Sequence, residues 1–348
     1  SICAATVTVR DLMVPTFTCP AAQTTPNCDA IVPDLVSLIT DAADNCGIAS
    51  ITQNPVAGSD FGNAPGQTIK VTITVTDVNG NVATCEVPIS IVDNVPPTFV
   101  NCPTTMIMIG NDPDQCSGKL NWSQPVATDN CVLMSVVQIA GPPPGTVVPV
   151  GQPQTVTYRA FDSAGNSSTC VFQIQVVDTQ KPELDDDILM PGDVTVECDA
   201  VPAPFVLTTA DVNDNCTPSA QLLIAFTEVR TNGNCPFNYV LTRTWTITDA
   251  AGNQRIHVQK VTVRDTKAPV AICKAATVTL DKFGNATITA ADVNNGSTDN
   301  CTAQANLTLS VSPSAFTCAN LGANVVTLTV TDQCGNASTC TAIVTVQE

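Results

Sequence analysis

Histidine, aromatic residues and basic residues are scarce in this chain. The 348 residues include one histidine, 4% aromatics and 13 Lys+Arg against 31 Asp+Glu, which gives a formal net charge of −18. Recognition of phosphates needs clustered cations, so this composition argues against nucleic acid or an anionic membrane as a partner. The lone His257 lies among strand-forming residues in RIHVQKV, which leaves the chain without the usual general base and zinc ligand. We therefore expect no enzyme.

Long apolar runs are absent as well. No stretch approaches the roughly 20 residues that a transmembrane helix needs. No charged segment followed by an apolar core stands at the start of the sequence, so any export signal has been removed or lies outside it. We expect an exported, processed chain without membrane insertion.

Cysteine, in contrast, is abundant, with 17 residues. Metal sites built from so many thiols would need CxxC pairs or nearby histidines, and the sequence has neither. Structural disulfides in an oxidising compartment remain, which predicts an extracellular or cell-surface location. The acidic residues are 26 Asp and 5 Glu, a bias typical of turns and of sites for hard cations.

An internal repeat organises the chain. The tripeptide DNC recurs with its cysteine at residues 46, 131, 216 and 301, and the pattern D-x-x-G-N begins at residues 77, 162, 249 and 332. An acidic residue closes an alternating segment at residues 11, 93, 178, 265 and 348. These markers predict repeats over residues 12–93, 94–178, 179–265 and 266–348. Residues 1–11 are left over as an orphan terminal strand.

Each repeat ends in a predicted β-hairpin. Apolar and polar residues alternate on both sides of the D-x-x-G-N turn, for example in VTITVTDVNGNVATCEVPISIVD at 71–93. Helical periodicity is nearly absent, apart from a possible short turn of helix in residues 33–43 or 288–295. The fold class we expect is all-β, with four tandem immunoglobulin-like β-sandwiches in an elongated rod.

Two repeats resemble known modules. The second repeat, with DNVPPTFVNCP (93–103), ATDNC (127–131) and YRAFDSAGNSSTC (158–170), resembles the hyalin (HYR) repeat, an immunoglobulin-like module of extracellular adhesion proteins. The fourth, with STDNC (297–301) and FTCANLG (316–322), looks like repeats of very long surface proteins of Bacteroidota. The resemblance implies an exported, repetitive surface or stalk protein. The third repeat departs from the pattern because Ile256 stands where the others have Thr-Cys.

Alignment of the repeats predicts a disulfide layout. The expected pairs are Cys19 with Cys28, Cys46 with Cys85, Cys102 with Cys116, Cys131 with Cys170, Cys216 with Cys235, Cys301 with Cys318, and Cys273 with Cys340. Each bridge contributes roughly 2–4 kcal/mol. Cys3, Cys198 and Cys334 are left as unpaired or intermolecular cysteines.

Because the number of cysteines is odd, at least one is free or has its partner outside this sequence. Cys3, in residues 1–11, is one of the three cysteines left without a predicted partner. In the alignment Cys3 matches Cys340, so these residues resemble the last strand of a repeat whose body is missing. Three interpretations stay open: the chain is a segment of a longer repeat protein, the strand adds to a neighbouring subunit, or the terminus is simply frayed.

Aspartates near the DNC motif and at the repeat boundaries form the candidate metal sites. Ca²⁺ takes six to eight oxygen ligands, which short Asp/Asn loops supply; the alternative is that each Asp caps its own turn. The candidate calcium ligands are Asp41, Asp44, Asp93, Asp129, Asp178, Asp211, Asp214, Asp265, Asp292 and Asp299.

The function that we predict is structural. The chain would form the disulfide-stapled shaft of a surface fibre, filament or adhesin, with copies of itself or adjacent repeats as end-to-end partners, possible head-to-tail assembly through the N-terminal strand, and no specified surface ligand. The alternative is an adhesion module that recognises a cell-surface or matrix partner through its inter-strand loops.

Overall fold

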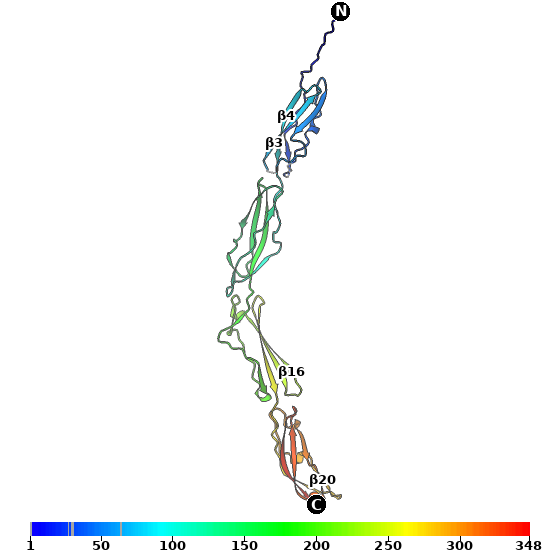
Figure 1. Ribbon diagram of the computed structural model, residues 1–348. Helices are drawn as coiled ribbons and strands as arrows, with labels where there is room; N and C mark the ends of the chain where they lie inside the picture. Colours follow the sequence, from blue (N-terminus) through cyan, green and yellow to red (C-terminus); the bar gives the residue numbers. More distant parts are fainter. Residues whose placement is uncertain (1, 27, 29–30, 63–64) are drawn as a thin grey trace. The chain divides into compact units, whose positions relative to one another are not determined.

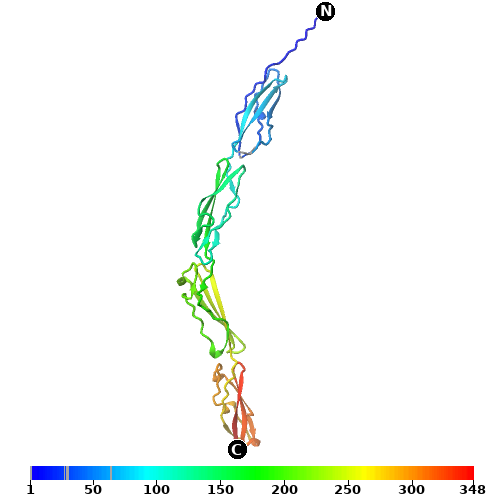
Figure 2. The ribbon, with the colours of Figure 1, turned by 60° about the vertical axis from the view of Figure 1, so that its left-hand side comes forward.

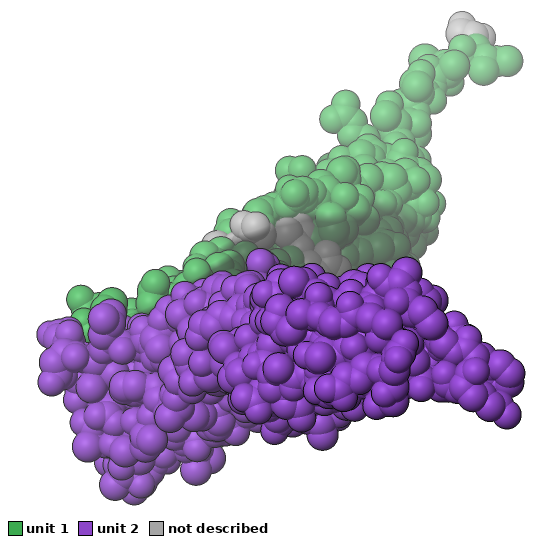
Figure 3. Space-filling view, turned by 90° about the horizontal axis from the view of Figure 1, so that it is seen from below, with its two compact units in different colours: residues 1–178 green, residues 179–348 purple. Residues whose placement is uncertain are grey.

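Two compact units make up the protein, residues 1–178 and 179–348, coloured separately in Figure 3. The computed structural model describes residues 2–26, 28, 31–62 and 65–348. Each unit contains two successive four-stranded sheets. Among the described residues, no helix has the length and apolar character needed to cross a bilayer.

The first sheet of unit 1 has the strand order β1-β4-β3-β2. Its strands are β1 (Gln23–Thr25), β2 (Ile48–Asn54), β3 (Thr68–Asp77) and β4 (Val82–Ile91). β1 runs parallel to β4, whereas β3 is antiparallel to β2 and β4; β3 and β4 lie side by side in Figures 1 and 2. The 3-10 helix η1 (Val36–Leu38) lies in the segment between β1 and β2.

Strict alternation in the hairpin builds the core of this sheet. Val71, Ile73 and Val75 on β3 are fully buried, and they belong to one cluster with Val87 and Ile89 of β4. Residues of period two share one face of a strand, so the alternation read from the sequence selects the buried face.

The second sheet of unit 1 has the order β6-β12-β11-β9 and again pairs its first strand parallel to its last. Its strands are β6 (Ile107–Gly110), β9 (Leu133–Ala140), β11 (Gln154–Asp162) and β12 (Ser167–Val177). Short pairs accompany it: β5 (Thr98–Phe99) with β8 (Ala127–Thr128), and β7 (Ser117–Lys119) with β10 (Val147–Pro149).

Unit 2 repeats this arrangement. Its first sheet, β14-β18-β17-β16, consists of β14 (Val194–Glu197), β16 (Leu223–Asn232), β17 (Tyr239–Thr248) and β18 (Gln254–Arg264). Accompanying elements are β13 (Glu183–Leu184), β15 (Val212–Asn213), η2 (Cys198–Ala200) and η3 (Ser219–Gln221).

The second sheet of unit 2, β19-β24-β23-β21, consists of β19 (Ala276–Thr279), β21 (Thr308–Ser312), β23 (Gly322–Thr331) and β24 (Ala337–Gln347). Beside it lie β20 (Asn285–Thr287), β22 (Ala315–Thr317), η4 (Gln304–Asn306), η5 (Cys318–Asn320) and the short helix α1 (Ala290–Val293). η1 and α1 fall in the two segments for which a turn of helix was expected.

The all-β fold class and its immunoglobulin-like sandwiches are confirmed. Each predicted range from residue 12 onward contains one four-stranded sheet, while the boundaries drawn at residues 93, 178 and 265 stay predictions.

The N-terminal segment lies apart from this architecture. Residues 2–11 form no strand, and in Figures 1 and 2 they run as an extended trace away from the body of unit 1. Val7 and Val9 are 83% and 91% exposed. The alternating apolar residues of this segment therefore have no core of their own.

Candidate calcium and disulfide sites at the repeat junctions

The D-x-x-G-N motif forms the hairpin turn that the sequence predicts. At Asp162, Oδ1 accepts the backbone N–H groups of Ala164 (3.0 Å) and Asn166 (2.8 Å), and Oδ2 accepts the side-chain amide of Asn166 at 2.8 Å. Gly165 takes a φ of 93°, a conformation that favours glycine. The carboxylate therefore holds the turn closed, and the amide of Asn166 faces the preceding linker.

The first junction, within unit 1, comprises Asp93, the loop Asp129–Cys131 and the turn Asp162–Asn166. Asn166 donates a side-chain hydrogen bond to the backbone oxygen of Asp93 at 3.0 Å. Carboxylate oxygens of Asp93, Asp129 and Asp162 lie within 4.8 Å of one another. Three acidic groups from two repeats therefore converge where the chain leaves β4.

Two of the oxygens at this junction lack a hydrogen bond. Asp93 is 5% exposed, and its Oδ1 accepts the N–H of Val95 at 3.0 Å, but its Oδ2 is buried without a partner. Asp129 uses Oδ1 to accept the N–H of Cys131 at 2.9 Å, and its Oδ2 is also buried without a partner. Burying an unpaired anionic oxygen is costly. The geometry fits a hard cation that takes both oxygens.

The second junction, within unit 2, comprises Asp265, the loop Asp299–Cys301 and the turn Asp332–Asn336. Asn336 donates to the backbone oxygen of Asp265 at 3.1 Å, as Asn166 does to Asp93. Asp265 is 4% exposed, and neither of its carboxylate oxygens makes a hydrogen bond; Oδ1 of Asp299 is buried without a partner too. The two junctions thus share one pattern of unsatisfied anionic oxygens.

Ionisation of Asp265 at the second junction is unfavourable when no cation is bound. Burial, followed by repulsion from Asp332, Asp299 and Glu197, raises the pKa of Asp265 to about 6. A carboxylate that resists ionisation in the folded protein is a place where a divalent cation would be strongly favoured.

This pKa predicts an unusual pH dependence in the absence of metal. The folded state holds the Asp265 proton more tightly than the unfolded state, whose pKa is near 3.8, so stability falls as the pH rises from about 4 to about 6. The loss amounts to up to about 3 kcal/mol at 1.36 kcal/mol per pKa unit. Urea unfolding in chelator at about pH 4.5 and pH 7.5 measures it, and Asp265→Asn should remove the decrease. A wild-type stability that rises over this range relative to Asp265→Asn would contradict the prediction.

The other candidate ligands divide into two groups. Asp211 and Asp292 cap backbone three residues away, accepting the N–H groups of Thr208 (2.7 Å) and Thr289 (2.7 Å), whereas Asp41 accepts the N–H of Thr18 (3.1 Å), 23 residues earlier in the chain. Hydrogen bonds from the hydroxyl and the backbone N–H of the same threonine lower the pKa of Asp41 and Asp211, and those from the backbone N–H and the hydroxyl of Thr289 lower the pKa of Asp292. For Asp211 and Asp292, the structure favours the turn-capping alternative. Asp41 instead ties its loop to the segment at Thr18.

Asp44, Asp178 and Asp214 lie closer to the junction pattern. Asp44 lies near Asp11 and Cys46. Asp214 accepts the N–H of Cys216 at 2.9 Å through Oδ2, while its Oδ1 is buried without a hydrogen bond. Asp178 follows β12 and is 8% exposed. Calcium ligation at any of the ten aspartates stays a prediction.

Asp162 and Asp332 were missed as cluster members. At D-x-x-G-N the sequence favours the turn role over calcium binding, and the turn role is correct. The available signal was that D-x-x-G-N recurs with nearly the same period as DNC. Two motifs with the same period keep the same relative position in every repeat, so both can contribute to one site.

Within single repeats, disulfides join an early segment to the last strand. Cys19 bonds Cys85, Cys102 bonds Cys170 and Cys273 bonds Cys340, with Cα–Cα distances of 6.0, 5.7 and 5.9 Å. The predicted Cys273–Cys340 pair is confirmed. The predictions for the other two repeats were wrong, because the cysteine of the last strand faces the repeat's own first segment rather than its DNC loop.

Other disulfides cross the junctions. Cys28 bonds Cys131 in unit 1, and in unit 2 Cys198 bonds Cys301 and Cys235 bonds Cys334. Cys116 and Cys216 are disulfide-bonded as well. At both junctions the DNC cysteine therefore bonds a cysteine of the preceding repeat: Cys131 bonds Cys28, and Cys301 bonds Cys198. The DNC loop can reach that cysteine because it lies at the end of its own sandwich.

These bonds overturn several predicted pairs and roles. The pairs Cys19–Cys28, Cys46–Cys85, Cys102–Cys116, Cys131–Cys170, Cys216–Cys235 and Cys301–Cys318 are not formed. Cys198 and Cys334, expected to be unpaired, are bonded, whereas Cys46 and Cys318 are free and exposed. Cys3 is free and exposed as well.

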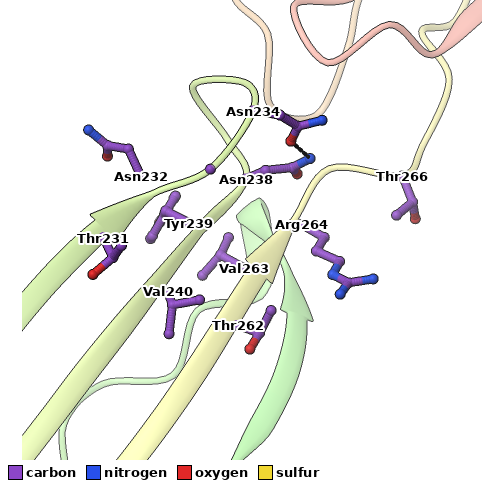
Figure 4. A pocket seen from close by; sticks show the side chains of 11 residues that line it. Thr231, Asn232, Asn234, Asn238, Tyr239, Val240, Thr262, Val263, Arg264 and Thr266 are labelled. Atoms are coloured by element: carbon purple, nitrogen blue, oxygen red, sulfur yellow. Dashed lines mark hydrogen bonds between the residues drawn. The ribbon is translucent and has the colours of Figure 1, made fainter.

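A shallow hollow of about 490 Å³ lies at the end of β16, β17 and β18 (Figure 4). Hydroxyl and amide side chains dominate its lining, and Arg264 is the charged residue there. In this view Asn234 and Asn238 are hydrogen-bonded to each other at 2.9 Å. His257 lies on β18: its Nε2 is 2.9 Å from the backbone oxygen of Pro191, and its ring packs against Trp245.

Comparisons with known proteins agree with the repeat pattern. Residues 92–176 match the family model described as the HYR domain. Hyalin from Strongylocentrotus purpuratus is 35% identical over 190 residues, which cover 51% of this chain and 15% of that protein. Human Sushi repeat-containing protein SRPX is 33% identical over 115 residues, covering 32% of this chain and 24% of that protein. The chain spans a minor part of the length of both relatives.

Solved structures provide more distant matches. The crystal structure of Drosophila N-cadherin EC1-4 covers 94% of this chain and 99% of its own, at 13% identity and a TM-score of 0.25. The Protocadherin GammaB4 extracellular domain covers 96% of this chain and 66% of its own, at 13% identity and a TM-score of 0.28.

The fold and the matches define an extracellular or cell-surface repeat protein. More specifically, one repeat, residues 92–176, matches the HYR domain, and the chain is similar to hyalin. The two relatives described above are animal proteins, so the resemblance to surface repeats of Bacteroidota has no counterpart in them.

Proposed function

We propose that this protein is the load-bearing shaft of an extracellular fibre, filament or adhesin. The observation that carries the proposal is the disulfide layout: one set of bridges closes each of three repeats on itself, and another joins successive repeats within each unit. A domain that only presents a binding loop has no need of covalent bonds across its junctions.

Calcium is the second part of the proposal. Ca²⁺ would bind at the first junction through Asp93 and Asp129 and at the second through Asp265 and Asp299, whose buried oxygens are unsatisfied. Each site takes ligands from two repeats, so the ion would resist bending between them. Waters and backbone oxygens would complete the six to eight ligands that calcium prefers.

Stretching single molecules of the full chain by its two ends tests the shaft. Cys19–Cys85 and Cys102–Cys170 span 66 and 68 residues, and at roughly 3.5 Å per residue each bridge withholds about 230 Å of chain. We expect short extensions in oxidising buffer with calcium and much longer ones after reduction, because the bridges shorten the covalent path. Equal extensions in both buffers would contradict a load-bearing role.

A binding measurement separates the shaft from a ligand-recognition module. The intact chain, immobilised on a surface, would be offered to cells and to extracellular-matrix proteins. A shaft should show no saturable binding in this assay. Saturable binding that is lost when inter-strand loops are exchanged between repeats would favour the adhesion module instead.

A further inference from the structure

The free Cys46 lies in a loop with the same geometry as the bonded DNC cysteines. Its N–H donates to Asp44 Oδ1 at 2.8 Å, and the Asn45 amide lies 3.3 Å from its Sγ. At the first junction the corresponding distances are 2.9 Å for Cys131 to Asp129 and 3.3 Å for Asn130 to Cys131. Cys46 is thus held like a cysteine that bonds a preceding repeat.

The surroundings of Asp11 extend this match. Asp11 Oδ1 accepts the N–H of Met13 at 3.1 Å, as Asp93 accepts that of Val95 at 3.0 Å. The Asn81 amide donates to the backbone oxygen of Asp11 at 3.4 Å, as Asn166 does to that of Asp93. Asp11 therefore occupies the position of the residue that leaves the last strand of a preceding repeat.

Residues 2–10 carry the side-chain pattern of such a strand. Cys3 precedes Asp11 by eight residues, as Cys85 precedes Asp93 and Cys170 precedes Asp178. In this register Val7 and Val9 correspond to Ile89 and Ile91, which are 0% and 1% exposed, and to Ile174 and Val176, both 0% exposed. Val7 and Val9 themselves are 83% and 91% exposed. The segment has the apolar face of a last strand without the sheet that would cover it.

We propose that residues 2–11, Asp44 and Cys46 form an N-terminal junction that receives an immunoglobulin-like body lacking its own last strand. Residues 2–10 complete its sheet, Cys3 bonds the cysteine of its first segment, and Cys46 bonds the cysteine that follows its first strand, as Cys28 does in the first junction. Each bond forms by oxidation of two thiols, with their protons and two electrons passing to a disulfide oxidant of the extracellular space.

A second copy of this chain fits the junction less well. Its fourth repeat already has β24 in the position that residues 2–10 would take, paired with β19 and β23. A body without a last strand has that position open. The body comes either from the same polypeptide or from another one, and its chemistry is the same in both cases.

A chimera provides the test. A copy of residues 12–82, with Cys46→Ala inside the copy, is placed directly before Ser1 of the full chain, so that residues 1–11 replace residues 83–93 in register. In the unfused chain an alkylating reagent should label Cys3, Cys46 and Cys318; in the chimera it should label Cys318 alone. Peptide mapping should find the copy's Cys19 bonded to Cys3 and the copy's Cys28 bonded to Cys46.

Matched variants keep the test decisive. Val7→Asp with Val9→Asp should leave the stability of the unfused chain unchanged but abolish both new bonds in the chimera. A folded copy with Cys46 still free would overturn the proposal, and so would residues 1–11 that remain as protease-sensitive as in the unfused chain. Disulfide ladders of the unfused chain that disappear in Cys318→Ala would overturn it in favour of a second copy.

The same mapping on natural material distinguishes the two sources of the body. If Cys46 is bonded and reduction leaves the mass of the denatured protein unchanged, the body belongs to the same polypeptide. If reduction splits the protein into separate chains, the body comes from another molecule. A free Cys46 in natural, fully oxidised material would overturn the proposal.

Discussion

Asp265→Asn should stabilise the protein in chelator and destabilise it in calcium. Without metal at about pH 7.5, the ionised Asp265 is buried and repelled by Asp332, Asp299 and Glu197, which is why its pKa is raised to about 6. An amide of the same size removes that charge, so the variant should gain up to about 3 kcal/mol in its free energy of unfolding.

Calcium should reverse the order of the two proteins. An ion that binds only the folded state stabilises the wild type by about 4.1 kcal/mol at a concentration of one thousand times its Kd, which exceeds the advantage of up to about 3 kcal/mol that the variant has in chelator. The variant lacks a carboxylate whose two oxygens are buried without hydrogen bonds, so it should gain much less. Urea unfolding of both proteins, each in calcium and in chelator, measures the four free energies.

Asp187→Asn is the control for net charge. Asp187 is exposed in the acidic loop of residues 185–187, away from the second junction, so its replacement should change the free energy by less than about 0.5 kcal/mol in either buffer. A variant Asp265→Asn that is less stable than the wild type in both buffers would show that Asp265 is structural and would remove the calcium site at this junction.

The hairpins could be predicted from the sequence because their determinants are local. Val71, Ile73 and Val75 alternate with threonines, and one face of β3 is buried as a result. The D-x-x-G-N turn likewise needs only residues within five positions of one another, as the hydrogen bonds of Asp162 show. Local pattern and final structure agree there because nothing distant competes with them.

The disulfides across the junctions could not be predicted in this way. Alignment of the repeats shows which cysteines correspond, but it does not show whether the DNC loop faces its own sandwich or the preceding one. Cys28–Cys131 and Cys198–Cys301 have the same separation of 103 residues, which exceeds the repeat period and is meaningful only once two repeats are packed end to end. The missing information was the contact between repeats.

The candidate calcium sites could be predicted in part, unlike the hairpins, which could be predicted well, and the disulfides across the junctions, which could not. Asp93 and Asp265 were expected at junctions from their position after the last strand, and both are buried there. Asp211 and Asp292 stand in the same sequence context as the junction aspartates, yet a backbone N–H three residues away bonds each of them, and Asp41 accepts the N–H of Thr18 from a distant segment. An aspartate's role depends on which donors the fold brings to it, which the order of residue types does not reveal.

Removal of the Cys28–Cys131 bridge should produce the largest loss of stability in unit 1. The bridge spans 103 residues and joins two repeats, and a loop of this length gives about 4.7 kcal/mol in the chain-entropy model, with measured values of about 2–5 kcal/mol for native disulfides. Each repeat keeps its own bridge, Cys19–Cys85 or Cys102–Cys170. We therefore expect Cys28→Ala with Cys131→Ala to remain folded, with a lower free energy of unfolding.

The loss should also separate two events that the bridge couples. In the wild type, repeats 1 and 2 should unfold together. The Cys28–Cys131 bond still joins the two repeats when one of them unfolds, so the unfolding of one disturbs the other. In the double variant, urea unfolding of the full chain should show an additional transition at lower urea. Cys46→Ala is the matched control: Cys46 is exposed and unbonded, so its removal should change the free energy by less than about 0.5 kcal/mol. If the double variant unfolds like this control, the bridge does not couple the repeats, and the shaft would have to derive its junction stiffness from calcium and from noncovalent packing alone.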